Sequence, residues 1–270
     1  MKWFFALSEA SLGHPDHDWI PLIRTAVASA RANTSLDPHF LYDGQPSAFT
    51  AELQSKGVTV IHHRLSYLGN IEHRWAELGL PPDAMRLAII AGAYLRTDIP
   101  GLELQDEYIL YTDCDVMFRA DPAVARFRPR YFACAPQRDR NDFTEMNSGV
   151  MVMNVPAMRV ELANFHHFTV NNFERFGAFD QDALREYYTG RYDPLPLELN
   201  WKPYWGIDPA AKIVHFHGPK PSAVRDLLQR PDFAVPPIWR ELFDESPAAY
   251  HHYLAEWDGY HALAAGPGGV

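Results

Sequence analysis

The segment 108–119, YILYTDCDVMFR, constrains the fold more than any other part of the chain. Its apolar and aromatic first half is typical of a buried sheet strand, which runs into Asp113 and Asp115. Carboxylates two residues apart on an extended backbone point to the same side. Two such groups repel each other unless a proton or a cation lies between them, so the pair indicates a hard divalent metal. A pair of loop-capping aspartates is the alternative.

The composition restricts the class of protein. Hydrophobic residues make up 47% of the 270 positions, which excludes a globally disordered chain. A net charge of -10 argues against nonspecific binding to nucleic acid or to an anionic membrane. No apolar run approaches the roughly 20 residues of a membrane span. The two cysteines, Cys114 and Cys134, fit a reducing compartment and leave a disulfide between them open. We therefore expect a cytoplasmic protein, with peripheral attachment to the cytoplasmic face of the membrane left open.

Strand and helix patterns alternate along the first sixty residues. The predicted strands cover 2–7, 39–42 and 58–62, and the predicted helices cover 19–32 and 50–56, with a loop at 13–16. This alternation predicts an α/β fold with a mostly parallel central sheet flanked by helices. The segment carries no GxGxxG, so a dinucleotide-binding fold has no support.

The rest of the chain continues this pattern. Further strands are predicted at 108–111, 131–135, 150–154, 195–199 and 213–216, and further helices at 84–97, 156–176, from Asp180, 238–243 and 248–260. The aromatic segment 67–82 shows no assignable period. We predict a catalytic domain over 1–222, a C-terminal helical extension over 223–270 packed on it, and a disordered tail at 264–270.

The last predicted strand ends in a second group of polar residues. His215 and His217 alternate on one side, and imidazole is a competent ligand for a Mn²⁺-like ion that carboxylates already hold. Gly218 permits a tight turn, and Lys220 offers a positive charge to a phosphate. A purely structural role for these histidines is the alternative.

Other candidate cations and ligands carry less information. Arg86 and Arg96 lie about 80° apart around the predicted helix 84–97, so both can face one anionic ligand or both can be solvated. Three adjacent histidine pairs lack ligand spacing and are interpreted as surface or interface residues: His62, His63, His166, His167, His251 and His252.

Five separated segments occur in one order: LRTDIP, LYTDCDV, NSGVMVMN, FDQDAL and HFHGPKP. Together they resemble the retaining, metal-dependent nucleotide-sugar glycosyltransferases of the GT-A fold. The resemblance is to glycosyltransferase family 8, which includes glycogenin and bacterial lipopolysaccharide galactosyl- and glucosyltransferases. It covers residues 84–221, and it implies chemistry as well as fold because the matched residues form the site.

The resemblance implies a metal centre and its ligands. Asp113 and Asp115 would hold Mn²⁺ (or Mg²⁺) against the donor diphosphate, with His215 as the third protein ligand. Arg96 would contact the phosphate or the sugar of the donor. Lys220 would neutralise the leaving phosphate.

The resemblance also implies a sugar pocket. Asn147 and Gly149 would line it, and the glycine would leave space for the hexose. Asp180 would bind sugar hydroxyls, and Gln181 would be the group nearest to the anomeric face.

Two parts of the chain match the family loosely. The first strand would meet the uracil and ribose through Ala6 and Ser8, but the N-terminal third resembles the family little. The family pattern HxxGxxKPW is one residue shorter here, with Ser222 in place of the Trp, which shifts Lys220 and makes His217 an alternative ligand to His215.

The resulting hypothesis is a metal-dependent glycosyltransferase. It would move a hexose from a nucleotide-sugar, by resemblance a UDP-sugar, to a saccharide or glycolipid acceptor in surface polysaccharide or lipopolysaccharide synthesis. Retention of anomeric configuration is expected. A metal-dependent nucleotidyltransferase and a non-catalytic sugar-nucleotide-binding protein are the alternatives. The donor sugar, the acceptor and the oligomeric state stay open.

Overall fold

The computed structural model describes residues 1–13, 18–230 and 232–266, which form two compact units. Unit 1 comprises Met1–Asp18, Asp37–Thr112 and Val124–Leu195, and unit 2 comprises Trp19–Leu36, Asp113–Ala123 and Pro196–Val270. The predicted loop at 13–16 falls outside the described residues except for Gly13, and so do residues 267–270 of the predicted tail. The tail prediction is wrong for Ala264 and Ala265, which belong to the helix Pro247–Ala265. The predicted domain boundary after residue 222 stays a prediction.

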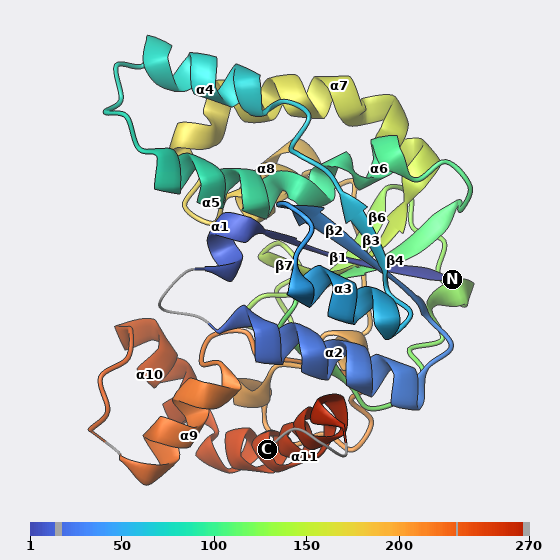
Figure 1. The fold of residues 1–270 in the computed structure, drawn as a ribbon, viewed down its shortest axis with the longest axis vertical. Helices are drawn as coiled ribbons and strands as arrows, with labels where there is room; N and C mark the ends of the chain where they lie inside the picture. The colour runs from blue at the N-terminus through green and yellow to red at the C-terminus, as the bar shows by residue number, and fades with distance from the viewer. Residues whose placement is uncertain (14–17, 231, 267–270) are drawn as a thin grey trace. The chain divides into compact units, whose positions relative to one another are not determined.

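Unit 1 is built on a mixed sheet with the strand order β3-β2-β1-β4-β7-β6-β8 (Figure 1). The strands are β1 (Lys2–Ser8), β2 (Asp37–Asp43), β3 (Thr59–His62), β4 (Tyr108–Thr112), β6 (Phe132–Pro136), β7 (Met146–Asn154) and β8 (Asp193–Pro194). All neighbours pair in parallel except β7, which is antiparallel to both β4 and β6. The predicted α/β fold with a mostly parallel central sheet is confirmed.

All helices of unit 1 except the first, which is only four residues long, bury apolar side chains. The helices are α1 (Glu9–Leu12), α3 (Ala48–Ser55), α4 (Leu68–Glu77), α5 (Ala84–Tyr94), α6 (Ile99–Leu102), α7 (Val155–Asn172) and α8 (Asp180–Tyr187). Phe4 and Tyr111 from the strands share one core with Tyr94 of α5 and Phe165 of α7, and all four are buried. The strands read as continuous apolar runs because both of their faces are covered.

One predicted strand is wrong, and one segment left without an assignment is helical. The strand predicted at 195–199 is wrong: β8 ends at Pro194, and Leu197–Leu199 forms a 3-10 helix. Proline has no backbone N–H, so Pro194 and Pro196 interrupt any ladder here after the single bond from Leu195 N to Cys134 O at 2.9 Å. The segment without an assignable period contains α4, which buries Trp75.

Unit 2 is mainly helical. It consists of α2 (Trp19–Asn33), α9 (Pro221–Gln229), α10 (Pro237–Glu245), α11 (Pro247–Ala265) and the two-stranded antiparallel sheet of β5 (Val116–Phe118) and β9 (Ile213–His215). α11 lies along α2 in Figure 1, and Trp257 and Tyr253 of α11 belong to one buried core with Leu22 of α2. α9 was not predicted. Among the described residues, none of the helices combines the length and hydropathy of a membrane crossing.

Asp98 of unit 1 corrects the interpretation of two histidines as surface or interface residues. Its side chain is buried at the end of the 3-10 helix Leu95–Asp98 and accepts hydrogen bonds from His63 Nε2 at 2.7 Å and from Ser66 N and Oγ at 2.7 and 2.8 Å. His166 Nε2 lies 3.2 Å from Asp98 Oδ1. Burial alone would raise the pKa of Asp98, but the contacts with His166, His63 and Ser66 lower it well below its ordinary value.

We expect Asp98→Asn to lower the free energy of unfolding by about 2–4 kcal/mol at pH 7, because buried donors then lose their anionic acceptor. Urea denaturation measures this, and Asp139→Asn is the matched control, since Asp139 is exposed. The folded-state pKa is lowered, so the carboxylate stabilises the fold above the unfolded value near ~4 and the stability is lost as the pH falls below it. A difference between wild type and Asp98→Asn that did not shrink in acid would contradict this account.

Candidate active site

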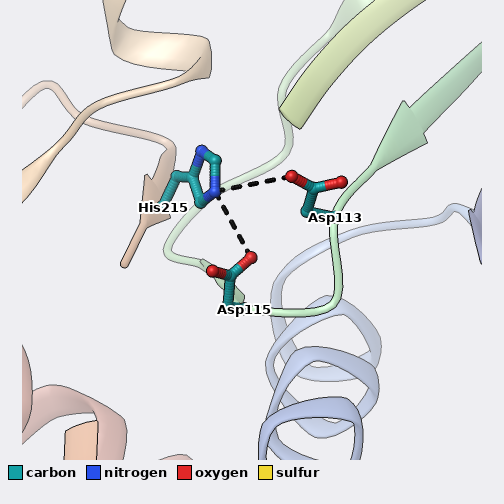
Figure 2. Close-up of side chains that lie close together, drawn as sticks. All are labelled: Asp113, Asp115 and His215. Atoms are coloured by element: carbon teal, nitrogen blue, oxygen red, sulfur yellow. Dashed lines mark ion pairs between the residues drawn. The ribbon is translucent and has the colours of Figure 1, made fainter. Parts of the chain in front are cut away.

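Two carboxylates and an imidazole meet in unit 2. His215 Nε2 lies 3.3 Å from Asp115 Oδ1 and 3.8 Å from Asp113 Oδ2, and one ligand atom from each residue falls within 4.8 Å of the others. Figure 2 shows the imidazole directed at both carboxylates. The backbone bends at Cys114 instead of staying extended, so alternation along one strand is not what brings the carboxylates together.

The pairing of β5 with β9 places His215 beside the acidic pair. Val116 faces His215 across the antiparallel ladder, and Phe216 N donates to Asp115 O at 2.9 Å. His215 Nδ1 lies 3.0 Å from Asn200 Oδ1, which can only accept, so Nδ1 carries the proton. Nε2 then presents its lone pair to the carboxylates, which is the tautomer of a metal ligand.

Asp115 is the most buried charge of this group. Burial alone would raise its pKa, but the ammonium of Lys220 holds that pKa well below its ordinary value. Lys220 forms an ion pair with Asp115 Oδ2 and donates to Phe216 O at 3.1 Å. Asp115 Oδ1 is buried and has no hydrogen-bond partner among the described residues. A buried anionic oxygen of this kind suits a cation, so the residues present fit a divalent metal.

His217 lies outside the group of three. Its Nδ1 is 3.2 Å from Tyr204 Oη, and burial, together with His215, Lys202 and Lys220, lowers its pKa. The structure therefore brings His215, and not its alternative, to the two aspartates. The turn after them requires a glycine, since Gly218 has φ of +92° and a Cβ would lie 2.7 Å from Leu242 Cδ1.

Unit 1 holds a second polar group around an arginine. Arg96 Nε lies 3.1 Å from Asp180 Oδ2, and Arg96 Nη1 donates to Ser148 O at 3.0 Å. The guanidinium also lies over the ring of Tyr111, 4.5 Å from its centroid. Asp180 is buried and Arg96 is mostly buried, so little water screens the pair. Arg86 is not part of it, because it is exposed and its guanidinium lies 5.7 Å from the ring centroid of Trp75.

The amide side chains of β7 and α8 extend this group. Gln181 Oε1 accepts from Asn147 Nδ2 and from Ser148 N, both at 3.1 Å, and Gln181 Nε2 contacts Gln137 Oε1. Gly149 N donates to Asn147 Oδ1 at 3.2 Å. Four predicted sugar-pocket residues thus lie together in unit 1, including Asp180 beside Gln181. Their role in binding a sugar stays a prediction.

The predicted nucleotide-binding residues lie at the carboxyl end of β1. Ala6 and Ser8 are both buried, and Ser8 Oγ caps α1 by accepting from Ser11 N at 3.1 Å. A Cβ on Gly92 of α5 would lie 2.6 Å from Ser8 Oγ, so only glycine allows this close approach of helix and strand.

Three neighbours of the site were not identified from sequence: Asn200, Ser148 and Gln137. Asn200 precedes β9 by thirteen residues, and no local pattern connects it with His215. Ser148 is the one of the three that the sequence could have indicated, because it lies in the NSG segment. A small polar side chain inside an apolar strand needs a hydrogen-bond partner from a neighbouring element.

Known structures show which fold this is. GlyE, a glycosyltransferase of Streptococcus pneumoniae, has 18% sequence identity and a TM-score of 0.60, with 96% of this chain and 63% of that chain covered. The galactosyltransferase LgtC, solved with donor and acceptor sugar analogues, has 18% identity and a TM-score of 0.58 over 90% of this chain and 100% of that chain. The bifunctional glycosyltransferase WbbM has 14% identity and a TM-score of 0.57, with 91% of this chain and 51% of that chain covered.

These similarities confirm the GT-A glycosyltransferase fold. The chain spans less than two thirds of the length of GlyE and about half of WbbM. A scan against protein-family models and a search of curated proteins found no match.

Proposed function

We propose that this protein is a metal-dependent glycosyltransferase that moves a hexose from a UDP-sugar to a saccharide or glycolipid acceptor. The observation that carries the proposal is the convergence of Asp113, Asp115 and His215, of which the aspartates precede β5 and the histidine ends its partner strand β9. The GT-A fold of the neighbours supports sugar transfer as the type of reaction.

Asp113, Asp115 and His215 would hold Mn²⁺ or Mg²⁺. When bound, the ion stabilises the charge that develops on the leaving diphosphate. The orientation of His215 by Asn200, and the unsatisfied oxygen of Asp115, support this ligand set. In the described structure Lys220 is paired with Asp115, and in the donor complex it would turn to the phosphates.

The polar group of unit 1 would bind the sugar. Asp180 is held by Arg96 and Ser148, and its carboxylate is an acceptor for sugar hydroxyls. Because this carboxylate is already paired, we propose that it orients the hexose and does not attack it. The amide of Asn147 donates to that of Gln181 at 3.1 Å, and we propose that both line the same sugar pocket.

We propose transfer with retention on a single face of the sugar. The bond from the anomeric carbon to the diphosphate breaks while the bond to the acceptor oxygen forms on that face. The acceptor's proton passes to the departing phosphate oxygen, so charge and atoms balance. A role in surface polysaccharide or lipopolysaccharide synthesis, at the cytoplasmic face of the membrane, is part of this proposal.

The alternatives differ from this proposal in observable ways. A nucleotidyltransferase needs basic residues in the phosphate loop after the first strand, and α1 with its capping Ser8 contains none. A non-catalytic binding protein would bind the donor without hydrolysing it. Slow metal-dependent hydrolysis of a UDP-sugar in the absence of an acceptor distinguishes the transferase from both.

The test is calorimetric titration of UDP, GDP and their common sugar conjugates with and without Mn²⁺. We expect micromolar affinity for one nucleotide in the presence of Mn²⁺ and at least tenfold weaker binding in EDTA. If the nucleotide bound equally well without the metal, or did not bind at all, the proposed function would be wrong and only the fold would be shared with the glycosyltransferases.

A further inference from the structure

Unit 1 contains an apolar pocket beside the polar group. It lies between the end of α4, the start of α5 and the segment 173–179, and it has a volume of about 140 Å³. Its buried floor includes Trp75, Ile90 and Phe176, and its partly exposed walls are Leu80 and Phe179. An apolar cavity of ~150 Å³ in another protein binds benzene, so the size suits one aromatic ring or a short alkyl group.

The floor of this pocket is preformed. The rings of Trp75 and Phe173 are stacked with centroids 6.0 Å apart and 12° between their planes. Trp75 Nε1 donates to Pro81 O at 2.9 Å, which satisfies its only polar atom. The floor therefore offers apolar surface and favours an apolar occupant over a polar one.

The mouth of the pocket has the opposite character. Three exposed charged side chains surround it: Asp83, Arg86 and Glu174. Groups of this kind hydrogen-bond hydroxyls, so the pocket suits a molecule with an apolar end inside and a hydroxylated end at the rim.

Phe179 connects the pocket to the polar group. Its backbone has φ of +46° and ψ of −115°, a conformation that costs free energy for any residue except glycine. The ring lines the pocket, and the next residue is Asp180, whose carboxylate pairs with Arg96. Consecutive Cα atoms are only ~3.8 Å apart, so the pocket wall directly adjoins the residue that we assign to the hexose.

We infer that this pocket binds the apolar aglycone of an acceptor glycoside. The inference rests on the proposed glycosyltransferase function and names its acceptor class: glycosides that carry an aryl or alkyl group. The aglycone packs against the apolar lining of Leu80, Ile90 and Phe176, and the sugar ring of the acceptor lies at the charged mouth, where Arg86 lies over the Trp75 ring at 5.7 Å from its centroid.

The first test compares phenyl and methyl β-glucoside and their galactoside counterparts by titration of the full chain. We expect the phenyl glycoside to bind at least about tenfold more tightly, because only its ring buries apolar surface. Leu80→Glu puts a charge on the wall and should weaken phenyl glycoside binding by about tenfold or more. Leu104→Glu makes the same change at a side chain that lies elsewhere in unit 1 and is 71% exposed, and it should leave the affinity for the phenyl glycoside unchanged. Phe179→Ala provides a second wall variant.

Equal affinity for phenyl and methyl glycosides, or equal effects of Leu80→Glu and Leu104→Glu, would overturn the pocket assignment. The second test measures donor turnover by wild-type protein with each glycoside present. Turnover that rises with the phenyl glycoside and not with the methyl glycoside supports the acceptor role, whereas phenyl glycoside that binds but leaves turnover unchanged overturns it. Absence of metal-dependent UDP-sugar hydrolysis without any glycoside would instead refute the proposed function itself.

Discussion

Asp115→Ala is expected to weaken Mn²⁺-dependent nucleotide binding by at least about 100-fold and to lower kcat/KM for donor turnover by about 10³-fold. A metal that stabilises a leaving diphosphate contributes several kcal/mol to the transition state, and ~4 kcal/mol corresponds to that factor. Asp115 Oδ1 is a buried carboxylate oxygen without a hydrogen-bond partner among the described residues, so we expect the largest loss of metal affinity when this ligand is removed.

Folding has to be separated from function in this experiment. Removing Asp115 leaves the ammonium of Lys220 without its carboxylate in a mostly buried position. The double variant Asp115→Asn with Lys220→Met removes both charges, and we expect it to stay folded and still lose the metal dependence. Asp226→Ala is the control in the same unit, since Asp226 pairs with the exposed Arg230 one helical turn away. Wild-type affinity for Mn²⁺ and nucleotide in the double variant would contradict the assignment of the metal ligands.

Asp180→Asn is expected to lower kcat for donor turnover by about 10²-fold and to leave Mn²⁺-dependent UDP binding within about threefold of wild type. Asp180 belongs to the group that we assign to the hexose, whereas the metal ligands belong to the other unit and the bare nucleotide has no hexose. Loss of the charged pair with Arg96 also removes the constraint on the carboxylate, and misplacement of a substrate-orienting group typically costs such factors.

Asp182→Asn is the matched control, because it changes the same side chain two residues later in the same helix. Asp182 pairs with Arg185 at 2.7 Å and accepts from Ala178 N at 2.8 Å, away from Arg96. We expect its kcat to stay within about threefold of wild type. Equal losses in the two variants would mean that Asp180 only stabilises the start of α8.

The arrangement of the two groups explains why these two experiments report on different steps. Asp113 and Asp115, which we assign to the metal, come from the bend before β5, and His215 comes from β9, all within unit 2. The residues that we assign to the hexose come from the 3-10 helix after α5, from β7 and from the start of α8, all within unit 1. Nucleotide binding and sugar positioning can therefore be disturbed one at a time.

The sequence by itself determined the elements whose signal is local. Apolar runs bounded by turns predicted β1, β4 and β7, and helical spacing of apolar residues predicted α2 and α7. These signals are local because burial of one face gives the apolar residues of a helix or strand a regular spacing. The apolar residues 195–199 were predicted as a strand, but Pro194 and Pro196 interrupt the strand pairing there, and Leu197–Leu199 forms a 3-10 helix.

Only the tertiary structure decided which distant side chains meet. The ladder between β5 and β9 sets His215, and not His217, against Asp113 and Asp115, and the partner of its other ring nitrogen, Asn200, follows from the same packing. His63 and His166 are separated by more than a hundred residues and converge on Asp98. Such contacts depend on register and helix docking, which involve many weak interactions across the whole core, so no short window of the sequence contains them.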